Sequence, residues 1–221
     1  MSNPKRVVVL LSGNGSNLQA IIDKQSDYKS YQLVAVFSNN EKAFGLERAK
    51  THQIPVCSMD HRAFESREAF DLELIKAIDQ FEPDLVVLAG YMRILSTQFV
   101  AHYANRLINI HPSLLPAYKG MNTYQRVLSD GQTEHGTTVH FVTPKLDSGT
   151  QLLQASLPIT TADTEESLRQ RVQAMEHQIY PLAVHLITSG RLTIKDSVAY
   201  LDNKPLDPKG YPLQEHALEI P

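Results

Sequence analysis

The sequence predicts an α/β fold: a single domain with a doubly wound, mostly parallel sheet, later antiparallel strands and a long C-terminal helix. Through the first half of the chain, short apolar runs alternate with segments of helical periodicity. This is the pattern of a parallel sheet covered by helices on both faces. Two apolar runs then follow with only a loop between them, and an amphipathic stripe from Leu168 to Leu186 comes after them.

The first half supplies the expected parallel strands and their helices. Residues 6–11 are a continuous run rich in valine and leucine, typical of a strand buried on both faces. Residues 64–80 carry an apolar stripe at roughly helical spacing, and Ser96 is expected to cap the helix that follows it. Further strands are expected at 32–38, 54–58, 84–90 and 106–110, and helices at 18–24, 43–52, 64–80 and 96–104.

The second half changes character. Residues 137–143 and 151–159 are expected to form a pair of strands around the loop PKLDSGT. Asp163 is expected to cap the long helix with Glu166 as its capping-box partner, and Pro181 to kink that helix. Residues 191–206 suggest a terminal hairpin, so the folded domain is expected over 1–206 and a loose tail over 207–221.

Composition favours a soluble cytoplasmic protein. With 21 basic and 24 acidic residues the net charge is −3, which argues against bulk nucleic-acid binding. Cys57 is the single cysteine, so neither an intramolecular disulfide nor a cysteine-based zinc site is expected, and a reducing compartment fits. The N-terminus does not have the pattern of a secretion signal, and no apolar stretch approaches the ~18 residues of a membrane span.

The stretch SGNGSN, residues 12–17, stands between an expected strand and an expected helix. Gly13 and Gly15 allow a tight turn and close approach to a ligand, while the helix N-terminus favours an anion. Ser16 and Asn17 add side-chain donors. The loop has no Walker lysine and is not GxGxxG, so a single phosphate is favoured over nucleoside triphosphate hydrolysis or a dinucleotide. An ordinary strand-to-helix turn has the same composition, and the loop alone does not separate these interpretations.

The stretch LINIHPSLLP, residues 107–116, places an amide and an imidazole at the end of a core strand. Asn109 and His111 point to the same side because side chains alternate along a strand. An amide can donate to a developing oxyanion, and an imidazole can move a proton near neutral pH. These are the two needs of acyl transfer to an amine. A satisfied core histidine beside a turn asparagine is the alternative.

Five other residues are weaker candidates. Asp147 in the later loop would hold His111 if it lay nearby, although an Asp before Ser-Gly is usually a turn former. His135 and His140 are five apart on an expected strand and should face opposite ways, which disfavours a shared metal; no metal is expected. Glu176 borders the apolar stripe of the long helix. Cys57 is interpreted as a packing residue.

Several stretches together resemble the folate-dependent formyltransferase family, on its ribonucleotide branch. The most specific are NIHPSLLP followed by HGTTVH and LDSG, and SGNGSN marks the branch. The others are VFSNN, AFGLERA, SREAFD, PDLVVLAGYMRIL and EHQIYP, in the family's order over nearly the whole chain. The resemblance implies a Rossmann-like catalytic domain. It also implies transfer of a formyl group from 10-formyltetrahydrofolate to the amine of glycinamide ribonucleotide in de novo purine synthesis.

The resemblance also implies residue roles. The catalytic set would be Asn109, His111 and Asp147, with direct attack of the amine, an oxyanion stabilised by Asn109 and protonated His111, and Asp147 supporting His111. The ribonucleotide would be bound by Gly15, Ser16, Asn17 and Glu176. The folate site would be lined by Arg67, Met92, Arg93, Ile94, Leu95, Asn109, Thr143 and Asp147, with the loop from Thr143 to Asp147 closing on the pterin. The expected partners are these two small molecules, with no nucleic acid or membrane, and the expected state is a monomer or weak homodimer.

Two departures from the family pattern bear on loop stiffness and closure. Bacterial members often have His-Thr-His where this chain has Asn122-Thr123-Tyr124, and Pro where it has Thr150. Three alternatives remain. A formyltetrahydrofolate hydrolase is expected to carry an extra N-terminal domain, and a tRNA formyltransferase a C-terminal RNA-binding domain. A phosphate-sensing module without turnover needs only SGNGSN and leaves Asn109, His111 and Asp147 without a purpose.

Overall fold

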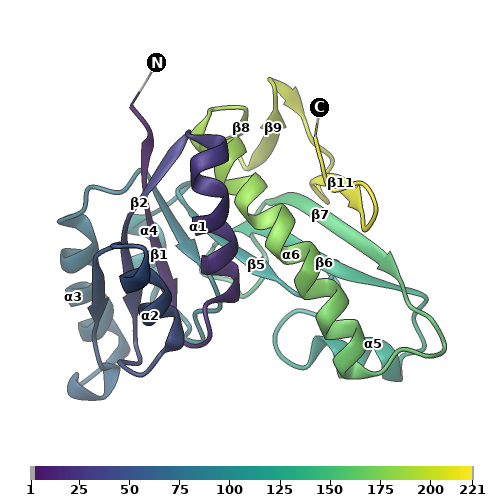
Figure 1. Ribbon diagram of the computed structural model, residues 1–221, viewed down its shortest axis with the longest axis horizontal. Helices are drawn as coiled ribbons and strands as arrows, with labels where there is room; N and C mark the ends of the chain where they lie inside the picture. Colours follow the sequence, from purple (N-terminus) through teal and green to yellow (C-terminus); the bar gives the residue numbers. More distant parts are fainter. Residues whose placement is uncertain (1–2, 221) are drawn as a thin grey trace. The chain divides into compact units, whose positions relative to one another are not determined.

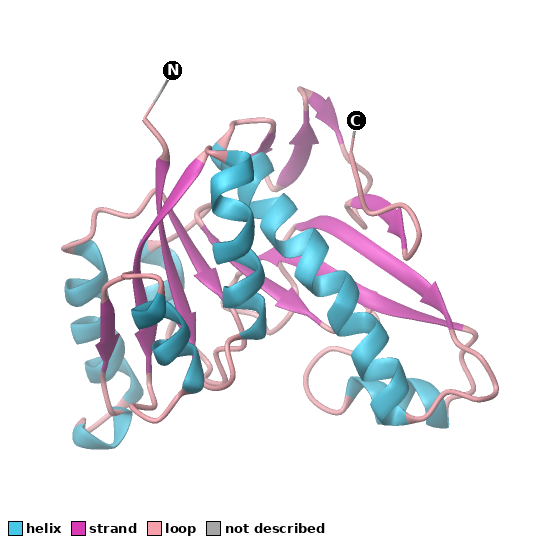
Figure 2. Cartoon of the chain, in the orientation of Figure 1, coloured by secondary structure: helices cyan, strands magenta, loops and turns pink. Residues whose placement is uncertain are grey.

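The computed structural model describes residues 3–220. The chain forms two compact units, Met1–Asn109 and Ile110–Pro221. One strand, β5 (Leu107–His111), crosses the boundary between these ranges. Figures 1 and 2 show the elements of both units.

The first unit contains a parallel sheet whose strands follow the order β3-β2-β1-β4-β5. Strand β1 (Lys5–Leu11) is central, and its residues Val7 to Leu11 are fully buried, as a strand covered on both faces requires. The other strands are β2 (Tyr31–Ser38), β3 (Val56–Ser58), β4 (Leu85–Leu88) and β5. The first-half strands that the sequence predicts are therefore confirmed.

The helices of the first unit are α1 (Ser16–Tyr28), α2 (Phe44–Thr51), α3 (Arg67–Asp79) and α4 (Thr97–His102), with a short 3-10 turn η1 (His61–Ala63). Helix α1 packs against α2, and α3 against α4. The strand order reverses direction after β3, so right-handed crossovers put these two pairs on opposite faces of the sheet. The predicted Ser96 cap is confirmed, because its hydroxyl accepts from the Phe99 backbone N–H.

The second unit is built around the antiparallel pair β6 (Glu134–Phe141) and β7 (Gln151–Pro158). The long helix α6 (Glu165–Thr188) packs on both strands and contains Pro181 in its interior. A separate antiparallel sheet is formed by β8 (Leu192–Lys195), β9 (Val198–Leu201) and β10 (Lys204–Pro205), and it contains the hairpin predicted at 191–206. Helix α5 (Thr123–Ser129) was not predicted.

The structure corrects the predicted cap of the long helix. Thr164 is the N-cap, and its hydroxyl accepts from the Ser167 N–H while Ser167 reaches back to the Thr164 N–H. Asp163 instead accepts hydrogen bonds from Thr160 and pairs with Arg171 at 2.9 Å. The Asp163–Glu166 capping box is therefore wrong by one position, because the carboxylate is already occupied.

Two predicted element boundaries also need correction. The helix expected over 64–80 starts only at Arg67, where the Ser66 hydroxyl accepts from the Ala69 N–H. Within the stretch expected to be a loose tail, Tyr211–Gln214 forms strand β11, parallel to β7. The division into a domain over 1–206 and a tail over 207–221 stays a prediction. No helix in the described part of the chain is long and apolar enough to cross a membrane.

Candidate active site

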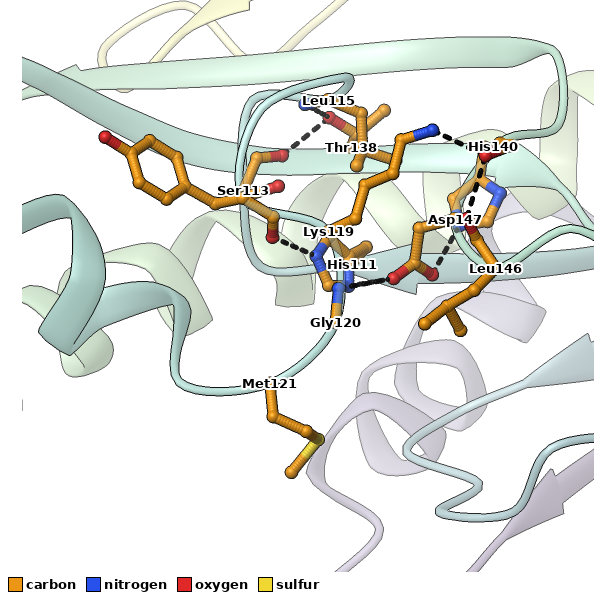
Figure 3. Close-up of polar contacts among 12 residues, drawn as sticks. His111, Ser113, Leu115, Lys119, Gly120, Met121, Thr138, His140, Leu146 and Asp147 are labelled. Atoms are coloured by element: carbon orange, nitrogen blue, oxygen red, sulfur yellow. Dashed lines mark hydrogen bonds and ion pairs between the residues drawn. The ribbon is translucent and has the colours of Figure 1, made fainter.

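Asp147 lies between two histidine rings in the second unit (Figure 3). Its Oδ2 is 3.5 Å from His111 Nδ1, and its Oδ1 is 3.8 Å from His140 Nε2. The side chains of Asp147 and His111 are only 7% and 8% exposed. A buried carboxylate is stable only where hydrogen bonds or opposite charge compensate its desolvation. His111 and Asp147, two sequence candidates that are distant along the chain, are thus brought together.

The loop around Asp147 is held by the segment 119–120 and by its own tight backbone turn. The Gly120 N–H donates to Asp147 Oδ2 at 2.9 Å, and Lys119 Nζ donates to Ser148 Oγ at 2.5 Å. A Cβ at Gly149 would lie 1.7 Å from the Phe141 carbonyl oxygen, so only glycine fits there. Asp147 itself has φ of 44°, a left-handed conformation that is uncommon outside glycine. These contacts position the carboxylate toward His111.

The His111 ring is oriented from both sides. Its Nε2–H donates to the Tyr118 carbonyl at 3.0 Å, while Nδ1 faces the Asp147 carboxylate. A carbonyl oxygen can only accept a hydrogen bond, so Nε2 carries a proton. Nδ1 is then the ring nitrogen that faces Asp147. A doubly protonated ring satisfies both acceptors. Asn109, two residues earlier on β5 and half-buried, has its side chain on the same side of the strand as His111 by alternation.

His140 is a member of this cluster that the sequence analysis did not assign to it. Burial lowers its pKa, and the hydrogen bond to the Phe141 carbonyl and the charge of Asp147 oppose that effect. His135 lies outside the cluster, with the Tyr124 ring edge-on to it at 5.4 Å. Burial lowers the pKa of His135 to about 4, and the charge of His111 adds to that effect. Both imidazoles are therefore neutral near pH 7. The HGTTVH motif in the sequence gives only the spacing of the two histidines, not their environments.

Glu176 on α6 reaches the same part of the second unit. It is 7% exposed, and its Oε1 accepts from the Thr137 hydroxyl at 3.4 Å. The same hydroxyl is 3.0 Å from the His111 carbonyl. Glu176 is thus linked to the His111 backbone through a single residue, although the sequence could place it only on the border of an apolar stripe.

In the first unit, SGNGSN forms the connection from β1 to α1. Gly15 is the N-cap of α1 with φ of 75°, a conformation that favours glycine. Ser16 and Asn17 are the first residues of the helix, and its first turn contains no acidic residue. The loop therefore has the conformation and charge that an anion site needs.

The predicted folate segment 92–95 also belongs to the first unit. The Met92 N–H donates to Ser12 Oγ at 2.9 Å, which attaches this segment to the beginning of SGNGSN. Met92 and Ile94 are each 65% exposed. The Arg93 guanidinium lies over the Phe70 ring of α3 at 5.1 Å, and Leu95 is half-buried beside Ser96.

The two remaining predicted folate residues are held by local contacts. Arg67 begins α3 and pairs with its neighbour Glu68 at 2.9 Å. In the second unit, the Thr143 hydroxyl donates to the Lys145 carbonyl at 3.1 Å and lies in the loop that leads to Asp147. The roles of all these residues stay predictions.

The family departures have visible structural consequences. Asn122 adopts φ of 57° as the N-cap of α5, and Tyr124 in that helix packs edge-on against His135. Thr150 donates to the Ser197 carbonyl at 3.0 Å, which ties the end of the Asp147 loop to the β8–β9 turn. Within residues 3–220, no cluster of His, Cys, Asp or Glu is arranged to hold a metal ion.

A glycine-containing loop follows the first strand of the parallel sheet, and β5 ends at His111, whose side chain forms a buried pair with Asp147. The formyl transferase family matches residues 5–184, and the chain belongs to it.

Within the family, the chain groups with phosphoribosylglycinamide formyltransferases. The one from Escherichia coli (strain K12) is 53% identical over 210 residues, covering 95% of this chain and 99% of the relative. The one from Haemophilus influenzae is 45% identical over 94% of this chain and 98% of the relative. A solved phosphoribosylglycinamide formyltransferase from Coxiella burnetii has a TM-score of 0.92 and 48% identity, covering 95% of this chain and 99% of that one.

Proposed function

We propose that this protein transfers the formyl group of 10-formyltetrahydrofolate to the amine of glycinamide ribonucleotide. The products are formylglycinamide ribonucleotide and tetrahydrofolate, a step of de novo purine synthesis. The single observation that carries the proposal is the distance of 3.5 Å between the Asp147 carboxylate and His111 Nδ1. His111 lies on β5, the strand that also contains Asn109. Family membership and the full-length relatives support the same reaction.

In the proposed reaction, the ribonucleotide amine attacks the formyl carbon directly. A C–N bond forms to the amine, the bond from the formyl carbon to N10 of the folate breaks, and one amine proton ends on N10. The Asn109 amide and protonated His111 stabilise the oxyanion of the tetrahedral intermediate. The Asp147 carboxylate stabilises the imidazolium and accepts or relays the amine proton, directly or through water.

Binding residues have separate proposed roles. Gly15, Ser16 and Asn17 bind the ribonucleotide phosphate at the start of α1, and Glu176 binds its ribose or amine end. Arg67, Met92, Arg93, Ile94 and Leu95 line the folate site, together with Asn109, Thr143 and Asp147. Binding both reactants in a reactive orientation removes much of the entropic barrier to a reaction between two molecules.

The test follows tetrahydrofolate release from 10-formyltetrahydrofolate by the purified protein, with and without glycinamide ribonucleotide. The proposal expects release only when the ribonucleotide is present, together with formylated ribonucleotide. Equal release without it, with formate as the product, would identify a hydrolase instead. No release in either reaction would sink both activities.

A further inference from the structure

The AFGLERA segment, residues 43–49, has no role in the proposed reaction, yet its helix α2 touches the phosphate loop directly. The Gly45 N–H donates to the Gly13 carbonyl at 3.0 Å. A Cβ at Gly15 would lie 2.6 Å from Gly45 Cα, and a Cβ at Gly45 would lie 2.5 Å from a Leu11 methyl group. Neither position has room for a side chain. The start of α2 and the SGNGSN loop therefore pack backbone against backbone.

Arg48 extends this contact one helical turn further along α2. Its Nε donates to the Asn14 carbonyl at 2.9 Å, and Nη2 donates to Asn14 Oδ1 at 3.1 Å. Nη1 donates to Gln19 Oε1 on α1 at 3.2 Å. One guanidinium thus binds the main chain of the loop, a side chain of the loop and the first turn of the helix behind it. The Phe44 ring, 4.9 Å from the guanidinium carbon, limits its movement.

Charge and geometry both favour an anion at this loop. All three acceptors of Arg48 are uncharged amide oxygens, so none of these bonds neutralises its positive charge. By engaging both oxygens of Asn14, Arg48 fixes the residue between the two loop glycines. A planar fork with several donors can do this, whereas a lysine ammonium is a single point charge.

We propose that Arg48 is a positioning residue for the phosphate group of the substrate: it holds SGNGSN in its binding conformation and adds positive potential there. This inference rests on the proposed function in assigning the substrate phosphate to that loop. Arg48 acts through Asn14 and Gln19 and contributes nothing to the formyl-transfer step itself. Its loss should therefore weaken binding of the phosphorylated reactant and leave the formyl donor unaffected.

The experiment measures ribose 5-phosphate binding by calorimetry for the wild-type chain, Arg48→Met, Arg48→Lys and a control, Lys50→Met. Lys50 lies on the same helix and pairs with Glu47 at 2.7 Å, so Lys50→Met removes one positive charge without touching the loop. We expect binding about tenfold weaker in Arg48→Met, since charge-assisted hydrogen bonds are lost. Arg48→Lys should recover only part of the affinity, and Lys50→Met should match the wild type.

Steady-state kinetics of the same variants provide a readout that general destabilisation would not reproduce. In Arg48→Met, KM for glycinamide ribonucleotide should rise about tenfold, while kcat and KM for 10-formyltetrahydrofolate stay within twofold. Unchanged ribose 5-phosphate affinity in Arg48→Met, an equal loss in Lys50→Met, or no binding by the wild type would overturn the inference. If ribose 5-phosphate binding depends on Arg48 but the wild-type chain transfers no formyl group, the proposed function is wrong and this inference still holds.

Discussion

At the scale of single residues, the proposed chemistry depends on how the His111 ring and the Asp147 carboxylate are oriented. The Tyr118 carbonyl accepts the hydrogen bond from His111 Nε2–H, and His111 Nδ1 faces Asp147. Asp147 is buried and accepts from the Gly120 N–H, so it is positioned without help from solvent. An amide in place of the Asp147 carboxylate keeps the shape of that side chain but removes the charge that supports the imidazolium, whereas an amide in place of the His111 ring removes the imidazolium itself.

Asp147→Asn and His111→Asn should each lower kcat roughly 10²- to 10⁴-fold, because each removes part of the oxyanion stabilisation or the proton transfer. Steady-state turnover of 10-formyltetrahydrofolate with glycinamide ribonucleotide measures the effect. Ribose 5-phosphate binding should be unchanged, since neither residue belongs to the phosphate loop. Turnover within tenfold of the wild type in either variant would remove that residue from the catalytic set.

His135 should make the protein less stable as the pH falls. Its pKa is about 4 in the folded chain and 6.5 without the fold, so between these values only the unfolded chain binds the proton. The free-energy cost is absent above pH 6.5, grows as the pH falls through that value, and levels off below the folded pKa. From pH 7 to pH 5, His135 should therefore cost roughly 1–2 kcal/mol of unfolding free energy.

Urea unfolding of wild type, His135→Gln and His216→Gln at pH 7 and pH 5 measures this contribution. Other histidines also contribute to the wild-type dependence, so the difference between variants is the relevant quantity. His135→Gln should lose less stability than the wild type between the two pH values, and exposed His216 should serve as the unchanged control. Parallel behaviour of all three proteins would contradict the assignment.

At the scale of elements, the position of the Asp147 carboxylate depends on two loops that bind each other. The segment 118–120 contacts His111, Asp147 and Ser148 through successive residues. The Arg126 guanidinium on α5 donates to the Lys119 carbonyl at 2.8 Å and lies over the Tyr118 ring. The short helix α5 therefore supports the loop that orients His111.

Lys119→Met should lower kcat/KM for 10-formyltetrahydrofolate about tenfold. The substitution removes the hydrogen bond from Lys119 to Ser148 and loosens the loop that carries Asp147. The free energy of a hydrogen bond from a charged donor corresponds to a change of about this size. Lys145→Met is the control for charge, because Lys145 is an exposed lysine in the loop that carries Asp147. An equal effect in both variants would point to the net charge of the loop rather than to the bond.

The strong periodic elements could be predicted from the sequence, and the weaker ones could not. Strand β1 and helix α6 have long apolar patterns, whereas α5 buries only Thr123 and Val127 and shows no stripe. Pro212 argues against a strand in the tail, but β11 is an edge strand beside β7, and a sheet edge tolerates proline. Asp163 and Thr164 are both good cap residues, and the hydrogen bonds from Thr160 and the ion pair with Arg171 engage Asp163 elsewhere.

Site residues followed the same division. Asn109 and His111 were predictable because they interrupt a core strand, and SGNGSN because of its glycines and its place between strand and helix. The place of His140 in the cluster was not predictable. Strand alternation predicts which face of the strand its side chain is on, but not that the later loop brings Asp147 close to it. Arg48 was hidden in an ordinary amphipathic helix, and only the contacts with Asn14 and Gln19 distinguish it.

At the scale of the whole molecule, the chain divides its proposed tasks between two stretches of sequence. The phosphate loop and the segment 92–95 belong to the first unit, and His111, Asp147 and Glu176 to the second. Asn109 is the last residue of the first unit, on the strand that continues into the second. The most direct test of the proposed reaction follows the transferred formyl group itself.

The decisive measurement is the fate of the formyl carbon. Protein in excess is mixed with ¹³C-formyl-labelled 10-formyltetrahydrofolate and glycinamide ribonucleotide, and the products are identified by mass spectrometry. The account predicts that the label appears in formylglycinamide ribonucleotide, one equivalent for each tetrahydrofolate formed. Label recovered as formate, or tetrahydrofolate formed without labelled ribonucleotide, would contradict it.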